Sequence, residues 1–89
     1  MAEVILFEHA NFHGAHKHLF ASERNLAAGD DNFFNDITSS IVVKSGTWEF
    51  FRDSDFQDFE ARLGPGLYHD VRTVGITNDT VSSVRRVGS

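Results

Sequence analysis

The chain has 89 residues, no cysteine and a formal net charge of −5, with 13 acidic residues against 8 lysines and arginines. This composition excludes disulfide bonds and disfavours nucleic acid as a partner, because an acidic surface repels the phosphate backbone. No apolar run approaches the ~20 residues of a membrane span, and the N-terminal segment lacks the basic start of a signal peptide. We therefore expect no membrane contact, and a cytoplasmic location is favoured.

Alternation of apolar and polar residues predicts short strands separated by frequent turns. The expected strands are, in chain order, 3–8, 16–20, 39–46, 47–53, 58–63 and 82–87. Segments 22–34 and 67–75 are each expected to hold at most a helical turn, since neither supports an amphipathic helix. The nine phenylalanines are expected mainly in the core. The pattern as a whole predicts an all-β fold.

A hexapeptide of the form N-D-x-x-S-S occurs twice, at 35–40 and 78–83. The copies begin 28 residues after Phe7 and 27 residues after Phe51, so each follows an aromatic residue at a nearly equal distance. The repeat predicts two similar units, about 3–44 and 47–87, neither of which can bury its apolar face alone. We therefore expect one domain over 1–89, with the two units sharing a core.

The hexapeptide offers hard oxygen ligands, which suit calcium or magnesium better than zinc or copper. Its aspartate and its first serine are three positions apart, so an extended segment aims them to opposite sides. Two such segments lying side by side can each complete the other's site. The expected combinations are Ser39 and the Ile37 carbonyl with Asp79, and Ser82 and the Thr80 carbonyl with Asp36. The alternative is turn chemistry, in which Asn and Asp form Asx turns and serine caps backbone groups.

The stretch from Phe7 to Gly14, an aromatic residue, six further residues and a glycine, resembles the Greek-key signature of the βγ-crystallins. Both hexapeptides match the calcium signature N/D-N/D-x-x-S/T-S of that family's microbial members. The likeness covers about residues 3–87 and is strongest to archaeal single-domain members. It implies two Greek-key motifs packed as a β-sandwich, with two Ca²⁺ ions bound at one end.

The resemblance also implies a backbone carbonyl ligand from the residue after each hairpin aromatic, which gives Glu8 and Arg52. The residues expected to bind calcium are Glu8, Asn35, Asp36, Ile37, Ser39, Arg52, Asn78, Asp79, Thr80 and Ser82. With about one carboxylate in each site, dissociation constants of roughly 10⁻⁶ to 10⁻³ M are expected, and weaker binding of magnesium. The expected role is a structural module that calcium stabilises, a monomer or weak homodimer and not an enzyme.

Two residues depart from the family pattern. Asp58 stands where the second motif has a glycine, so we expect the second hairpin to be strained or opened. Arg52 places a positive charge beside an expected carbonyl ligand, which predicts a lower calcium affinity there.

Other patterns carry less weight. Segment 53–58 begins like an EF-hand loop, but Asp58 occupies the sixth position, which requires glycine. Four histidines crowd the first hairpin and indicate either a transition-metal site or an exposed polar surface: His9, His13, His16 and His18. A secreted inhibitor or toxin on the same fold, with incidental metal sites, is the alternative function.

Overall fold

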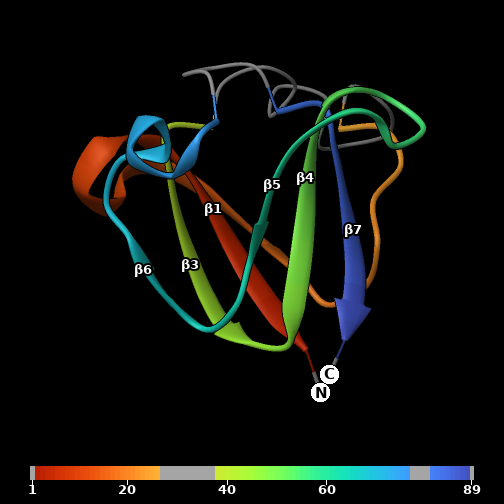
Figure 1. Cartoon of the computed structure of the whole chain (residues 1–89). Helices are drawn as coiled ribbons and strands as arrows, with labels where there is room; N and C mark the ends of the chain where they lie inside the picture. The colour runs from red at the N-terminus through yellow and green to blue at the C-terminus, as the bar shows by residue number, and fades with distance from the viewer. Residues whose placement is uncertain (1, 27–37, 77–80, 89) are drawn as a thin grey trace.

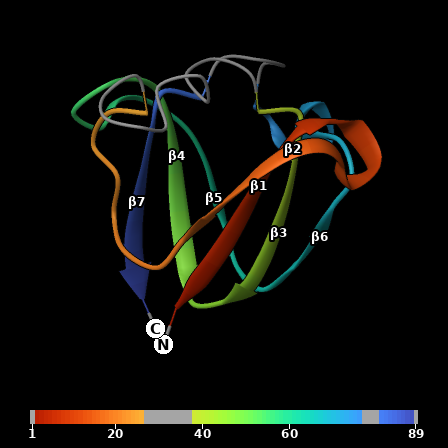
Figure 2. The same cartoon turned by 180° about the vertical axis from the view of Figure 1, so that it is seen from behind.

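The computed structural model describes residues 2–26, 38–76 and 81–88. These residues form two antiparallel β-sheets packed face to face, and no α-helix occurs among them (Figures 1 and 2). The strands are β1 (Glu3–His9), β2 (His13–Leu19), β3 (Ser40–Ser45), β4 (Thr47–Asp53), β5 (Gln57–Leu63), β6 (Gly66–Tyr68) and β7 (Ser83–Gly88). Two short 3₁₀ turns are η1 (Ala10–Phe12) and η3 (Val71–Val74).

The first sheet has the order β2-β1-β3-β6, and the second has the order β5-β4-β7. The chain builds β1 to β3, crosses to the second sheet for β4 and β5, returns to the first for β6 and ends in β7. Glu23, which follows β2, pairs with Val84 of β7 through backbone hydrogen bonds of 2.8 and 2.9 Å. Each half therefore lends a segment to the other half's sheet, and the all-β Greek-key sandwich expected from the sequence is confirmed.

The six strands predicted from alternation are all present, with small shifts of their ends. β2 begins at His13 instead of residue 16, because pairing with β1 resumes directly after η1. Alternation does not predict β6, since three residues are too few to show it. The helical turn expected within 67–75 is η3, which the Asp70 carboxylate caps by accepting the Arg72 N–H at 3.0 Å.

The core lies between the sheets and is built from alternate residues of the central strands. Trp48 and Phe50 of β4 are fully buried, in one cluster with Val4 and Leu6 of β1. The Trp48 indole N–H donates to the Ser45 carbonyl at 3.0 Å, so the one polar group of this side chain is satisfied. The period-two pattern thus places these side chains on the inner face of each sheet.

The phenylalanines are not mainly core residues, which corrects the expectation from composition. Among the described phenylalanines only Phe50 and Phe51 are buried, and Phe59 is 57% exposed. Phe12 and Phe56 are half-buried and lie edge-on to the aromatic residue that begins their own hairpin, with ring centroids 5.7 Å apart in both cases. These two rings brace the hairpins instead of filling the space between the sheets.

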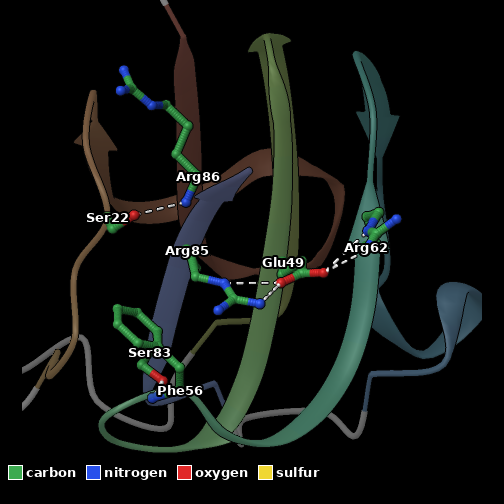
Figure 3. Close-up of polar contacts among 7 residues, drawn as sticks. All are labelled: Ser22, Glu49, Phe56, Arg62, Ser83, Arg85 and Arg86. Carbon is green, nitrogen blue, oxygen red and sulfur yellow. Dashed lines mark hydrogen bonds and ion pairs between the residues drawn. The ribbon is translucent and has the colours of Figure 1, made fainter. Parts of the chain in front are cut away.

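A buried carboxylate lies on the outer side of the second sheet, where Glu49 of β4 is only 3% exposed. Arg62 of β5 donates to Glu49 Oε2 at 2.8 Å, and Arg85 of β7 donates through Nε to Glu49 Oε1 at 3.0 Å (Figure 3). The Arg85 guanidinium also lies 5.5 Å from the centroid of the Phe51 ring. One ion-pair network therefore joins all three strands of this sheet.

This network predicts that the protein loses stability in acid. The hydrogen bonds from Arg85, and next those from Arg62, hold the Glu49 pKa below its ordinary value of 4.5 despite the opposing effect of burial. A carboxyl group with a lowered folded pKa contributes stability that is present above its unfolded pKa and is lost as pH falls through the folded value. Urea denaturation between about pH 6 and about pH 2 should show a smaller acid loss in Glu49→Gln than in the parent protein.

Glu49→Gln should still lose some stability as the pH falls, because other carboxylates are also paired with arginines. Arg72, for example, lowers the pKa of Asp70 to about 2. If the free energy of unfolding decreases by the same amount at low pH in Glu49→Gln and in the parent protein, the Glu49 network contributes nothing to stability.

Candidate metal centre

Both copies of the repeated hexapeptide end where β3 and β7 begin, at the same end of the sandwich (Figure 1). The structure describes the last three residues of each copy, 38–40 and 81–83. The remaining expected ligands lie outside the described residues: Asn35, Asp36, Ile37, Asn78, Asp79 and Thr80. The geometry of the candidate centre therefore rests on the fourth, fifth and sixth residues of each copy and on the hairpins beside them.

The fifth residue of each copy, Ser39 or Ser82, is fastened to the hairpin of its own half. The Ser39 N–H donates to the Phe7 carbonyl, and the Ser82 N–H donates to the Phe51 carbonyl, each at 2.9 Å. Both serines are nearly buried, with 8% and 7% of their surface exposed. The two halves therefore place the fifth residue in the same way.

Glu8 and Arg52, from which hairpin carbonyl ligands are expected, directly follow these two aromatic residues. The contacts of Ser39 and Ser82 with the preceding carbonyls consequently place Ser39 beside Glu8 and Ser82 beside Arg52. Glu8 lies at an irregularity in the pairing of β1 with β2, which shifts between Phe7 and His9. The described parts of each expected site, a serine and a hairpin carbonyl, are thus neighbours.

The sixth residue of each copy closes the hairpin of its own half. Ser40 Oγ donates to the His9 carbonyl at 2.6 Å and accepts the Phe12 N–H at 3.0 Å. Ser83 makes the same two contacts with the second hairpin: its Oγ donates to the Asp53 carbonyl at 2.6 Å. It also accepts the Phe56 N–H at 3.1 Å (Figure 3). Both serines are fully buried. The backbone-capping role that turn chemistry assigns to the motif therefore belongs to its last residue.

The fourth residue of each copy faces the core, since Thr38 and Val81 are both fully buried. Val81 belongs to the apolar cluster, whereas the buried Thr38 hydroxyl has no hydrogen-bond partner among the described residues. Such a hydroxyl costs about 1–3 kcal/mol of stability. The fourth residue therefore anchors the motif to the core, whereas the serine that follows it lies beside a hairpin carbonyl.

The second hairpin is strained and not opened, so the first of the two outcomes expected from Asp58 is the one observed. The backbone dihedral φ is positive at the same three positions of both hairpins: 59°, 62° and 85° at Asn11, Phe12 and Gly14, and 57°, 60° and 59° at Asp55, Phe56 and Asp58. The Arg24 guanidinium pairs with Asp55 at 2.7 Å, and the Arg24 carbonyl accepts the Asp55 N–H at 2.7 Å. The structure thus retains Asp58 in the left-handed conformation, which costs a non-glycine residue about 1–2 kcal/mol.

Two single variants, Asp58→Gly and Gly14→Asp, should change the free energy of unfolding in opposite directions. Asp58→Gly removes the strain and should raise the free energy of unfolding by about 0.5–1 kcal/mol after the entropy of glycine is counted. Gly14→Asp should lower it by about 1–2 kcal/mol, since φ there favours glycine. A Cβ at Gly14 would also approach His9 Cδ2 at 2.6 Å and Glu8 Oε1 at 2.9 Å, so both side chains must move.

Urea denaturation of the two variants in calcium-free buffer measures these effects. Equal losses in both variants would show that the second hairpin has adapted to aspartate and stores no strain at this position.

Arg52 is exposed and borders an open depression of about 380 Å³, together with Asp58 and Glu60. A backbone carbonyl can bind a cation whichever way its own side chain points, and two acidic neighbours offset the arginine charge. The described donors, serine hydroxyls and carbonyls, are of the kind that a hard cation prefers. These residues therefore fit calcium, and the carboxylates that would complete the sites belong to the undescribed part of the motif.

Within residues 2–26, 38–76 and 81–88, no three His, Asp or Glu side chains converge as a metal site. The four histidines of the first hairpin therefore do not form a three-ligand cluster with each other or with a described carboxylate. No helix in the same parts of the chain is long and apolar enough to cross a membrane.

Known proteins with similar sequences and structures cover nearly the whole chain. The family model for Beta/Gamma crystallin matches residues 3–87. A Beta/gamma-crystallin from Ciona intestinalis is 40% identical over 86 residues, which are 97% of this chain and 99% of the relative. The chain therefore belongs to the βγ-crystallin family, as the resemblance of its motifs indicated.

Two solved microbial structures share this fold. A betagamma-crystallin from an archaeon is 40% identical with a TM-score of 0.86 and covers 97% of this chain and 98% of that one. A second, from Methanosaeta thermophila, is described as transition-metal-ion-binding; it is 38% identical with a TM-score of 0.79 and covers 93% of this chain and 98% of that one. The expected similarity to archaeal single-domain members is confirmed.

Proposed function

We propose that this protein is a structural module that binds two Ca²⁺ ions at the end of the sandwich where β3 and β7 begin. The observation that carries the proposal is the matched placement of Ser39 and Ser82, each nearly buried and bonded to the carbonyl that precedes Glu8 or Arg52. A chain that repeats a polar motif, and places the fifth and sixth residues of both copies in the same way, offers two similar positions for a cation.

Each proposed site combines donors from both copies of the motif. Besides the hairpin carbonyl of Glu8 or Arg52, the first site takes Ser39, the Ile37 carbonyl and Asp79, and the second takes Ser82, the Thr80 carbonyl and Asp36. Asn35 and Asn78, which begin the two copies, complete the set of residues that we propose to bind calcium. Each ion would thereby tie the two motifs, about 3–44 and 47–87, to each other.

Oxygen donors with about one carboxylate a site favour calcium over magnesium, because magnesium demands a tight octahedron and gives up its water reluctantly. The net charge of −5 adds a general attraction for cations. The Methanosaeta relative is described as binding transition-metal ions, so the identity of the metal is itself part of the test.

Calorimetric titration of the chelator-treated protein tests the proposal. We expect about two equivalents of Ca²⁺, weaker binding of Mg²⁺, and the loss of one site's affinity in Ser39→Ala and of the other's in Ser82→Ala. Ser54→Ala, in the turn between β4 and β5, is the control and should bind as the parent protein does. Binding of Ni²⁺ but not Ca²⁺ would contradict the proposal.

The sharing of ligands between the two copies has its own test. Asp36→Ala should weaken the site that contains Ser82, so that combining it with Ser82→Ala adds little, whereas combining it with Ser39→Ala should remove both sites. The reverse pattern would mean that each copy of the motif completes its own site.

A further inference from the structure

The outer face of the first sheet carries a histidine pair that the proposed calcium sites do not use. His16 and His18 are two residues apart on β2, so their side chains lie on the same face of the strand. β2 is an edge strand of its sheet, and both histidines are exposed. From the geometry of these two rings we propose a binding site for one borderline transition-metal ion of the Cu²⁺, Ni²⁺ and Zn²⁺ class.

The separation of the two rings suits one shared ion. Their centroids lie 5.3 Å apart, with the ring planes at 67°. Two imidazoles that bind one metal at 2.0–2.1 Å with a near-tetrahedral angle have their centroids about 5 Å apart. The His16 ring also lies against the Phe7 ring, at a centroid distance of 5.6 Å, which limits its rotation. The separation of the two rings therefore matches the one that a shared ion requires.

A carboxylate of the neighbouring strand sets the tautomer of His18. Glu3 Oε2 lies 2.7 Å from His18 Nδ1, and the Glu3 side chain is 21% exposed. With its proton on Nδ1 and bonded to Glu3, a neutral His18 presents the lone pair of Nε2. Metal-binding histidines commonly donate their second ring N–H to a carboxylate in this way, which orients the ring and raises its basicity. Glu3 is thus a positioning residue and not a ligand.

Nitrogen ligands select the metal. Imidazole suits copper, nickel and zinc, whereas calcium takes oxygen ligands, so the two kinds of site should not compete. With two protein ligands and water in the other positions, the affinity order should be Cu²⁺ before Ni²⁺ and Zn²⁺. The proposal shares no residue with the calcium sites, so either can fail without the other.

The test is a titration of the calcium-saturated protein with Cu²⁺, followed by the broadening of histidine ring signals in NMR spectra. We expect one equivalent of Cu²⁺ to broaden the His16 and His18 signals before those of the other three histidines. The double variant His16→Gln with His18→Gln should bind Cu²⁺ at least tenfold more weakly. The matched control, His9→Gln with His13→Gln, removes the facing pair at the tip of the same hairpin and should leave the affinity unchanged.

Glu3→Gln separates a positioning role from a merely structural one. Both ligands remain in this variant, so the protein should still bind Cu²⁺, but about 10-fold to 100-fold more weakly. A far-UV circular dichroism spectrum like that of the parent protein confirms that every variant is folded. The proposal is overturned if the His16 and His18 double variant retains the parent affinity, if the His9 and His13 variant loses it instead, or if calcium saturation alone prevents Cu²⁺ binding.

Discussion

Calcium at a hundredfold excess over its dissociation constants is expected to raise the free energy of unfolding by about 5 kcal/mol, from two sites that contribute about 2.7 kcal/mol each. A chain of 89 residues has a small core. The total free energy of unfolding of a domain is about 5–15 kcal/mol, so this gain is a large share of it. Urea denaturation in calcium and in chelator measures the difference directly. The melting temperature should rise by roughly 20 °C or more.

The control is the double variant Ser39→Ala with Ser82→Ala. Alanine keeps the backbone N–H that bonds to the hairpin carbonyl, and denaturation in chelator measures any loss of stability that is independent of calcium. The gain from calcium should mostly disappear, because each site has lost its hydroxyl. A full calcium gain in this variant, or an equal gain from magnesium in the parent protein, would contradict the assignment of two oxygen-rich sites to these serines.

The strands could be predicted because local alternation carries their signal. In β4, the apolar Trp48 and Phe50 are fully buried between the sheets and alternate with Glu49 on the outer side, which is the period-two pattern that the sequence displays. The place of β6 could not be predicted in this way. It depends on the pairing of Leu67 with Val42 across a long connection, and such a pairing leaves no trace in three residues.

Long-range contacts also decide which polar residues become buried. Periodicity places Glu49 on the outer side of β4, opposite Trp48, but gives no sign that the side chain is covered. The cover comes from Arg62 and Arg85, which are 13 and 36 residues away along the chain. Phe59 is the opposite case: it is aromatic but exposed, because it lies on an outer face that no second sheet covers.

At the candidate site, the repeated motif locates the residues but does not separate their roles. Ser39 and Ser40 are adjacent and chemically identical, yet successive residues of an extended chain point to opposite sides. One serine is bonded through its backbone beside Glu8, and the other inserts its hydroxyl into the hairpin. The different roles of Ser39 and Ser40 follow from where the folded hairpin lies, and three positive φ angles set the shape of that hairpin.

Removing the hydroxyl of Ser40 or Ser83 should lower the free energy of unfolding by about 2–4 kcal/mol, with or without calcium. Each hydroxyl satisfies one backbone carbonyl and one backbone N–H in a fully buried position, and each group left unpaired costs about 1–3 kcal/mol. The contacts span 27 to 31 residues, so they fasten each hairpin to the start of a distant strand. Urea denaturation of Ser40→Ala and Ser83→Ala in chelator measures the loss.

The neighbouring serine of each copy supplies a matched control. Ser82→Ala changes the same kind of residue, similarly buried and one position earlier, and should lose the calcium-dependent part of the stability. Ser83→Ala should instead lose stability in chelator and keep two equivalents of calcium at high concentration, because its hydroxyl braces the hairpin without touching the ion. Equal losses for Ser82→Ala and Ser83→Ala in chelator would show that both hydroxyls are structural, and a loss confined to calcium-loaded Ser83→Ala would make Ser83 a ligand.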